Sequence, residues 1–180
     1  KMPSINTDLG FFATQFHSRQ SFYSAYTAKI TTGTQLFNPA TPHLNPKYLT
    51  EHPEENRRFG TSFETRFRGG AVYGELSYRP NQPLQYNGVD LLNAALLSSN
   101  TASPLSTSLH ALSPGAKFKG WEAHKAVQLQ LGSNFVIPKV LGAAGLSLGG
   151  EMIYKGGGDL PDQGEFRFGR ADVFGSAGWN

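Results

Sequence analysis

The sequence predicts an all-β protein, and within that class an antiparallel transmembrane β-barrel of which this chain forms a portion. Three observations lead to this prediction. Charged residues make up only 16% of the chain, whereas a soluble domain averages about 25%. Apolar and polar residues alternate over segments longer than the usual strand of about 5 to 6 residues. Long proline-rich connections, about residues 33–56 and 79–115, separate the alternating segments.

The composition argues against other classes. Aromatic residues reach 12%, too many for a charged disordered tail, and 21 glycines with 11 prolines do not suit a helical bundle. The longest weakly polar stretch, residues 135–148, contains Pro138 and Lys139 and is shorter than the roughly 18 apolar residues of a membrane helix. The absence of cysteine excludes disulfides and thiolate metal sites. The net charge of +3, without a basic stripe, gives no sign of nucleic-acid binding.

Two strands are predicted near the start of the chain, over residues 9–17 and 22–31. In the second, Phe22, Tyr26 and Ile30 lie on one side. The connection that follows, residues 33–56, holds four prolines and is predicted to be a long loop.

A β-hairpin is predicted over residues 59–78. With a period of two residues, the three phenylalanines of its first strand fall on one face, and the charged residues fall on the other. Gly69 and Gly70 follow, and this dipeptide suits the positive φ angles of a two-residue hairpin turn. The return strand, residues 71–78, alternates in the same way.

The second long connection, residues 79–115, contains one short predicted helix over residues 89–97. Apolar residues recur there at helical spacing behind Asn87, and Asp90 lies in the first turn. A second hairpin is predicted over residues 117–154, with its first strand ending at Leu131 and a connection that contains Asn134 and Pro138. A less regular strand begins at Glu165, which brings the total to about seven strands.

A transmembrane barrel accounts for these features together. Its strands of about 9 to 11 residues carry an apolar outer face and a polar inner face, with short periplasmic turns and long extracellular loops. Bacterial barrels have an even number of strands, so about seven strands cannot form a complete one. Residues 1–180 are therefore predicted to be a single β-barrel region that belongs to a larger barrel. The alternative is a soluble β-sandwich or lipocalin-like barrel, whose strands also alternate.

Two segments carry a family resemblance. They are GELSYRPNQPLQ at residues 74–85, continuing to VDLL at residues 89–92, and FRFGRADVFG at residues 166–175. Both resemble motifs of a large proteobacterial outer-membrane β-barrel family that is catalogued as a domain of unknown function. The resemblance implies that this chain is one region of a protein of several hundred residues. Because members are often encoded beside RND-type lipid exporters, it also implies a role in moving hydrophobic molecules through the envelope.

Two groups of candidate site residues follow from the predicted faces. Charged side chains on the polar face would line the lumen, either along a substrate path or as ion pairs that hold the strands in register. Leucines of the loop helix would form an apolar patch that contacts substrate, or would simply pack into the barrel mouth. The lumen-facing set is Glu64, Arg66, Glu75, Glu122, Glu151, Arg170 and Asp172, and the loop set is Leu91, Leu92, Leu96 and Leu97.

No catalytic residue, metal ligand or cofactor is predicted. The carboxylates near residues 156–165 match no complete calcium loop, the five histidines lack paired metal spacing, and no Gly-x-Ser-x-Gly elbow is present. An enzyme is therefore not expected. An outer-membrane lipid hydrolase remains an alternative, which a Ser–His pair within hydrogen-bond reach would favour.

The expected function is a passive one in the bacterial outer membrane. The barrel would act as a conduit or docking site for hydrophobic or amphipathic molecules, and a structural or adhesive barrel without transport is the other alternative. The expected partners are membrane lipids and lipopolysaccharide, a hydrophobic small molecule or lipid, and periplasmic or RND exporter components. Nucleic acid is not expected as a partner.

Overall fold

A computed structural model describes residues 6–29, 39–67, 69–96, 104–161 and 166–169. These residues form mostly antiparallel β-sheet with few helices, which confirms the all-β class. The chain divides into two compact units, each of which is described by itself. Unit 1 comprises Lys1–Phe16, Asn56–Gln82 and Lys125–Gly158, and unit 2 comprises His17–Glu55, Pro83–His124 and Asp159–Asn180.

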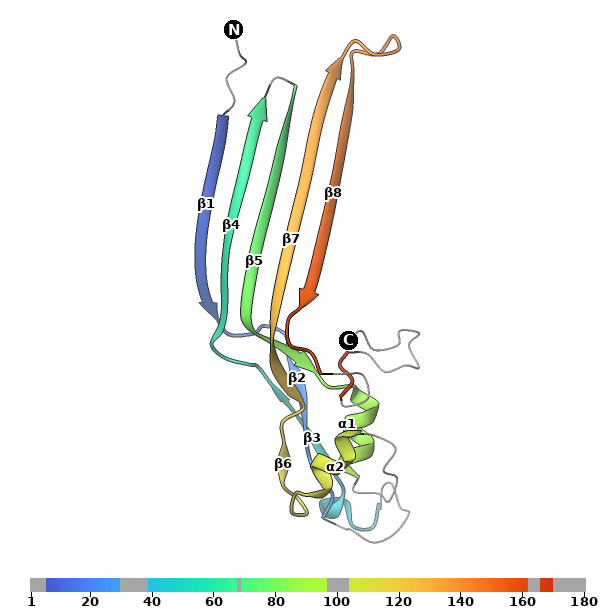
Figure 1. The fold of residues 1–180 in the computed structure, drawn as a ribbon. Coiled ribbons are helices and arrows are strands. Elements are labelled where there is room, and N and C mark those ends of the chain that lie inside the picture. Colours follow the sequence, from blue (N-terminus) through green and yellow to red (C-terminus); the bar gives the residue numbers. More distant parts are fainter. Residues whose placement is uncertain (1–5, 30–38, 68, 97–103, 162–165, 170–180) are drawn as a thin grey trace. The chain divides into compact units, whose positions relative to one another are not determined.

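The long strands form one five-stranded sheet in the order β1-β4-β5-β7-β8 (Figure 1). Every pairing with a known register in this sheet is antiparallel. The sheet does not close on itself, because β1 and β8 are edge strands that have no partner on their outer side within the described residues. The strands are β1 (Asn6–Phe16), β4 (Asn56–Phe67), β5 (Gly70–Gln85), β7 (Trp121–Pro138) and β8 (Gly145–Gly157).

The first predicted hairpin is present, but its turn comes one residue earlier than the predicted Gly69–Gly70 turn, because Gly70 already pairs with Phe67 and begins β5. Its register runs from Phe67 opposite Gly70 to Phe59 opposite Tyr78, and Gly69 has a φ of 92°. That angle is in the region where glycine is favoured because it lacks a Cβ atom.

The second predicted hairpin is also present, but its first strand is longer than predicted. The predicted strand ends at Leu131, whereas β7 continues to Pro138 and the turn lies at residues 139–144. Asn134 pairs with Gly149 and Pro138 with Gly145. A proline is tolerated there because at the end of a strand its missing N–H interrupts no central ladder bond.

The two predicted loops contain more regular structure than expected. β5 continues through Pro80 and Pro83 to Gln85; its pairing with β4 has ended at Tyr78, so on that side the prolines interrupt no ladder. The loop helix is present as α1 (Gly88–Ala95). The elements in these loops that were not predicted are the 3-10 turn η1 (Pro42–Leu44), β3 (Lys47–Glu51) and the second helix α2 (Pro104–His110). β6 (Lys117–Phe118) lies within the predicted hairpin 117–154 but is a strand separate from β7.

Unit 2 contains a three-stranded sheet in the order β3-β2-β6, where β2 spans Phe22–Tyr26. The predicted strand 22–31 ends at Tyr26 because the next residues bond elsewhere. The Thr27 amide donates to the carbonyl of Ala116 (2.9 Å), and the Ala28 amide donates to the carbonyl of Ala95 (2.8 Å). The chain thereby leaves the sheet and joins the helical part of the unit.

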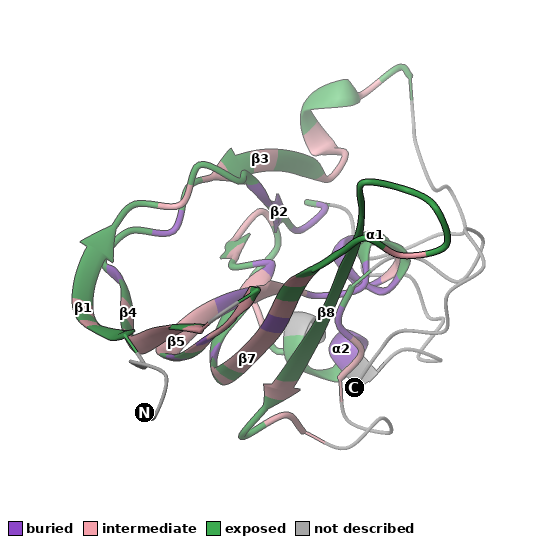
Figure 2. Ribbon diagram, turned by 90° about the horizontal axis from the view of Figure 1, so that it is seen from above, coloured by how far each residue is buried: buried purple, intermediate pink, exposed green. Residues whose placement is uncertain are grey.

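The hydrophobic core lies in unit 2. All ten of the buried hydrophobic residues among those described belong to this unit, and Tyr86, Leu91, Ala94, Leu105 and Phe168 are among the seven that form one cluster. In unit 1, by contrast, β8 is exposed along nearly its whole length (Figure 2). The five-stranded sheet therefore has no apolar core of its own in the described structure.

Candidate functional site

One face of the five-stranded sheet is polar. Asp8 of β1 pairs with Glu64 of β4, and Glu64 pairs with Tyr73 of β5, so these three side chains share a face. In the next such row, Gly10, Ser62 and Glu75 are aligned in the same way. Gly132 of β7 lies where a Cβ atom would overlap the Tyr73 ring, which extends this face to β7.

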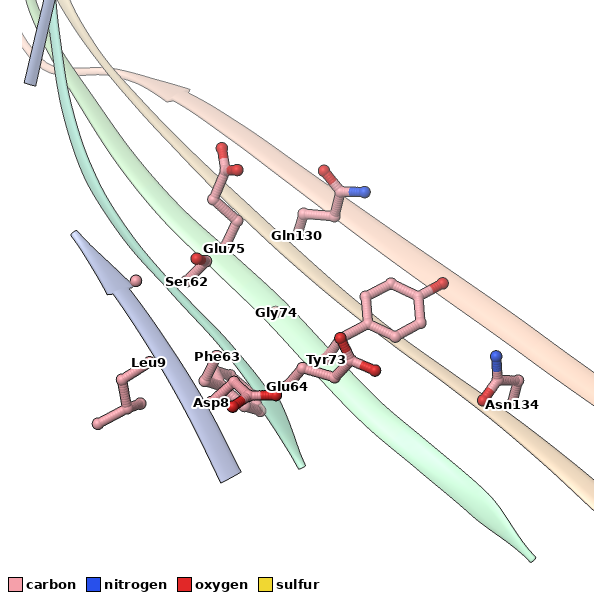
Figure 3. Close-up of a pocket in the computed structure, with 11 residues that line it drawn as sticks. Asp8, Leu9, Ser62, Phe63, Glu64, Tyr73, Gly74, Glu75, Gln130 and Asn134 are labelled. Carbon is pink, nitrogen blue, oxygen red and sulfur yellow. The ribbon is translucent and has the colours of Figure 1, made fainter. Parts of the chain in front are cut away.

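A hollow of about 600 Å³ lies on this face and is open to solvent (Figure 3). Carboxylates, two amides, a hydroxyl and a phenol contribute to its lining, together with Gly10 and Gly74. The polar members are Asp8, Ser62, Glu64, Tyr73, Glu75, Gln130 and Asn134.

The charges on the polar face are mostly paired. Arg66 Nε donates to Glu64 Oε1 at 2.6 Å, and Arg66 also lies 3.9 Å from Asp8. Glu75 accepts from Arg58, and Glu151 accepts from Gln130. Four of the predicted lumen-facing residues, Glu64, Arg66, Glu75 and Glu151, are thus on this face of unit 1. The contacts of Glu75 with Arg58, of Glu151 with Gln130 and of Arg66 with Asp8 join neighbouring strands, whereas Arg66 and Glu64 belong to the same strand, β4.

Sequence reasoning missed two members of this network, Arg58 and Asp8. Arg58 has the same parity as Glu64 and Arg66, so extending the two-residue period to the start of that strand would have found it. Asp8 shares its parity with Phe12 and Phe16, so only its pairing with Glu64 places it on this face. Arg58 also lies over the ring of Phe12, 5.0 Å from its centroid. A cation against an aromatic face is a favourable contact.

Glu122, another predicted lumen residue, is not among the residues that line this hollow. Glu122 lies in unit 2, where it accepts a hydrogen bond from the Tyr86 hydroxyl (2.8 Å) and lies 3.5 Å from His124 Nε2. Burial, followed by the nearby Glu122 carboxylate, raises the pKa of Tyr86 above its ordinary range. Arg170 and Asp172 lie outside the described residues.

The opposite face of the sheet is apolar and exposed. Phe11 is 82% exposed and Met152 is 57% exposed, although both are large apolar residues. Other exposed members of this face, placed by the strand registers, are Leu9, Phe59, Leu76, Tyr78, Leu148 and Tyr154. An apolar face on long strands was predicted, and the structure confirms the segregation of the two faces.

The loop helix α1 begins where the sequence placed it. The Asn87 side chain accepts from the amides of Val89 (3.0 Å) and Asp90 (3.4 Å), which satisfies two free donors at the helix start. Of the predicted leucine patch, Leu91 and Leu96 are buried, whereas Leu92 is 48% exposed. Leu97 lies outside the described residues. The patch is therefore split between the core and the surface.

An apolar cavity of about 790 Å³ adjoins the helix within unit 2. Leu91, Leu92 and Ala95 of α1 line it, together with residues of β2 and β3. Sequence reasoning missed the β3 contribution, because β3 was assigned to a loop and only its pairing with β2 brings it here.

The two segments that carry the family resemblance contact each other. Tyr86 and Phe168 form a β-bridge and their rings stack with centroids 5.1 Å apart. The guanidinium of Arg167 donates two hydrogen bonds to the Asp90 carboxylate. Residues 85–90 and 166–169 thus form one packed junction inside unit 2.

A family model matches residues 1–178, which is nearly the whole chain. The chain belongs to the family described as Protein of unknown function (DUF1302). No curated protein and no solved structure matches it.

Several other features of this DUF1302 chain bear on the candidate chemistry. Within the described residues, no helix has the length and apolar character needed to cross a membrane. The same residues contain no group of three or more histidines and carboxylates that could hold a metal ion. His52 contacts Ser18, but through the backbone carbonyl oxygen (3.2 Å) and not through the hydroxyl.

Proposed function

We propose that the five-stranded sheet is part of a transmembrane β-barrel in the bacterial outer membrane, and that this barrel is a passive conduit or docking site for hydrophobic or amphipathic molecules. The observation that carries the proposal is the exposed apolar face of the sheet. Leu9 is 69% exposed, Phe11 82% and Tyr154 60%. Large contiguous apolar patches mark contact with a membrane or with another protein.

The dimensions and edges of the sheet support a membrane as the apolar partner. Its strands have 11 to 18 residues, and a tilted strand needs about 9 to 11 residues to cross the hydrocarbon layer. The open edges at β1 and β8 would each pair with a further strand, because an unpaired edge is not tolerated in lipid. Barrel closure by such strands is part of the proposal.

The polar face supports the role of a path. In a closed barrel this face would line the lumen, so the hollow containing Glu64 and Glu75 would be reached from the aqueous interior. The protein would let such molecules pass without catalysing a reaction. Lipids, lipopolysaccharide and envelope exporter components would be the partners of such a route.

Two neighbouring residues of β8 allow a matched test. Met152 lies on the apolar face and is 57% exposed, whereas Ile153 lies on the opposite face, pairs with Gln130, and is 53% exposed. Arginine near the middle of a lipid-facing strand costs about 2–4 kcal/mol, and less near the interfaces. We expect Met152→Arg, made in a chain that includes the further strands that close the barrel, to reduce folding into phosphatidylcholine vesicles, and Ile153→Arg to fold nearly as well as the unmodified protein.

The measurement is the fraction of chain that becomes protected from protease in vesicles. Equal insertion of the two variants would contradict the proposal, because lipid contact predicts a difference between the two faces. Recovery of the unmodified chain as a monomer in buffer without detergent would contradict it as well.

A structural barrel without transport is the second candidate. The pairing of Arg58 with Glu75 on the neighbouring strand, and of Arg66 with Glu64 along β4, favours it, since charges that are paired within the wall stabilise the sheet and are not left to contact a substrate. Planar-bilayer conductance and transfer of a fluorescent fatty acid between vesicles separate the candidates. For a conduit, the unmodified protein shows higher bilayer conductance or faster fatty-acid transfer than the Met152→Arg variant. For a structural barrel, neither quantity exceeds that of the variant.

A further inference from the structure

A buried histidine lies between two carboxylates in unit 2. The His124 side chain is 7% exposed, and each of its ring nitrogens faces a carboxylate oxygen. Nε2 lies 3.5 Å from Glu122 Oε2, and Nδ1 lies 3.4 Å from Asp159 Oδ1. Glu122 belongs to β7, as His124 does, whereas Asp159 follows the end of β8. The ring therefore joins two segments of unit 2 that are 35 residues apart in the sequence.

The surroundings of the ring determine which nitrogen carries the proton when His124 is neutral. Nδ1 lies 3.1 Å from the backbone carbonyl oxygen of Asp159. A carbonyl oxygen only accepts hydrogen bonds, so Nδ1 must be the donor. Because a neutral imidazole has one donor and one acceptor nitrogen, Nε2 is then an acceptor. This Nε2 atom is buried and has no hydrogen-bond partner among the described residues.

A neutral His124 and the Glu122 carboxylate therefore present two acceptors to each other. Glu122 Oε2 faces Nε2 and also accepts a hydrogen bond from the Tyr86 hydroxyl at 2.8 Å. Since burial and the nearby Glu122 raise the pKa of Tyr86 above its ordinary range, this hydroxyl keeps its proton and continues to donate it to Glu122. A second proton, on Nε2, turns the repulsive contact between His124 and Glu122 into an attractive, charge-assisted one.

The other neighbours of the ring do not oppose its positive charge. Phe168 packs against His124 with ring centroids 4.9 Å apart and planes at 74°, and an aromatic ring is a favourable neighbour for a cation. The guanidinium of Arg167 is bound to Asp90. Lys125 follows His124 in β7, so its side chain points to the opposite side of the strand. Burial disfavours the charged ring, and the carboxylates on its two sides offset this effect.

The contact between His124 and Asp159 bears on the packing of the core. Leu160 follows Asp159, is partly buried, and packs against the hydrophobic cluster of unit 2. The ring thus holds the start of the segment 159–161, and an attraction that fixes Asp159 also keeps Leu160 on the core. Loss of that attraction would allow the segment to leave the core more often.

We infer that His124 is a pH-sensitive switch that holds the segment 159–161 on the core of unit 2. The protonated ring attracts Glu122 and Asp159, so the segment is closed. Without the second proton, Nε2 and Glu122 repel each other and the charge attraction to Asp159 is lost. Histidine changes its charge between about pH 5 and pH 8, so the stabilisation is present at the acidic end of this range and is lost as the pH rises. The inference goes beyond the proposed function and does not rest on it, because it concerns unit 2 alone.

Nuclear magnetic resonance of the ring nitrogens tests the positions of the protons. The full protein carries isotope-labelled histidine in detergent micelles, and the resonances missing from His124→Gln are those of His124. At about pH 8 we expect the proton on Nδ1, and at about pH 5.5 a proton on each nitrogen. A neutral ring with its proton on Nε2 would overturn the inference, because Nε2 could then donate to Glu122 at any pH.

A single introduced thiol measures the opening of the segment, since the sequence contains no cysteine. In Leu160→Cys, the thiol reacts fully with a maleimide only when the segment leaves the core. Leu141→Cys, at a side chain that is 100% exposed, gives the rate for an open site at the same pH. We expect the ratio of the first rate to the second to rise about threefold from about pH 5.5 to about pH 8, as the loss of a partly exposed ion pair allows. A ratio that does not change with pH would overturn the inference.

Variants made together with Leu160→Cys separate a switch from a purely structural role. Glu122→Gln places an amide donor beside Nε2, so the neutral ring is satisfied and the segment should stay closed at both pH values. His124→Gln removes the titrating group and should give one ratio at both pH values. His52→Gln is the matched control, because His52 is exposed and also belongs to unit 2, and it should keep the threefold rise. A full pH response in His124→Gln or in Glu122→Gln would overturn the inference.

Discussion

Arg167 donates two hydrogen bonds to the carboxylate of Asp90, at 2.6 and 2.9 Å, across a separation of 77 residues. Asp90 lies in the first turn of α1, where a negative charge is favoured by the helix dipole. Its side chain is 7% exposed, whereas that of Arg167 is 36% exposed. The pair joins the two segments that carry the family resemblance.

Removing the arginine should destabilise unit 2 more than removing the charge of the aspartate. Arg167→Ala leaves a buried carboxylate without its cation, which we expect to lower the free energy of unfolding by about 2–3 kcal/mol, discounted for the partial exposure of Arg167. Asp90→Asn leaves no buried charge and should cost about 1 kcal/mol. Urea unfolding followed by tryptophan fluorescence measures both. Equal decreases in the free energy of unfolding in the two variants would contradict the prediction that the buried Asp90 carboxylate depends on Arg167.

Gly120 should not tolerate a side chain. A Cβ atom there would overlap the carbonyl oxygen of Tyr23 and lie 2.9 Å from Leu91 Cδ2. We expect Gly120→Ala to lower the free energy of unfolding by about 2–3 kcal/mol through overpacking. Gly88→Ala is the control, because a Cβ atom at Gly88 meets nothing within 4 Å. It should be neutral or slightly stabilising, since alanine favours a helix more than glycine does.

Unit 2 should lose stability in acid partly through Glu51. Burial opposes ionisation of this carboxyl, but hydrogen bonds from Lys117 and Ser24 and the Lys117 charge outweigh it and hold the pKa of Glu51 below its ordinary value of 4.5. A lowered pKa in the folded state stabilises the fold above the unfolded-state pKa, and this contribution is lost as the pH falls through the folded-state pKa. We therefore expect Glu51→Gln to show a shallower loss of stability below pH 4.5 than the unmodified chain.

Lys117→Gln provides the complementary measurement. Without the lysine, the pKa of Glu51 should move toward its ordinary value, so acid unfolding of unit 2 should depend less on this carboxyl. Unfolding midpoints measured by fluorescence between pH 7 and about pH 3 report both variants. An acid response of Glu51→Gln identical to that of the unmodified chain would contradict the role of Glu51.

Arg58 and Glu75 should be energetically coupled on the polar face of the sheet. They form an ion pair, and their side chains are 29% and 32% exposed. A double-mutant cycle with Arg58→Gln and Glu75→Gln should give a coupling energy of about 0.5–1 kcal/mol. Reversible unfolding from detergent or vesicles supplies the four stabilities. A coupling near zero would mean that the pair does not hold β4 and β5 in register.

The faces of the long strands could be predicted from the sequence because alternation is a local property. Consecutive residues of a strand point to opposite sides, so the three phenylalanines of β4 and the charges between them define their two faces before any partner strand is known. The turn at Gly69 and the start of α1 behind Asn87 were predictable for the same reason, since each depends on a few neighbouring residues.

Only the tertiary structure determined which residues the side chains of these elements contact. Nothing local distinguishes Leu91, which enters the core, from Leu92, which lines the cavity, until β2 and β3 pair beside the helix. The same holds for Glu122, which has the alternation of a lumen residue but contacts Tyr86 and His124 in unit 2. Alternation is encoded by adjacent residues, whereas a contact such as that of Asp90 with Arg167 depends on how the intervening chain folds.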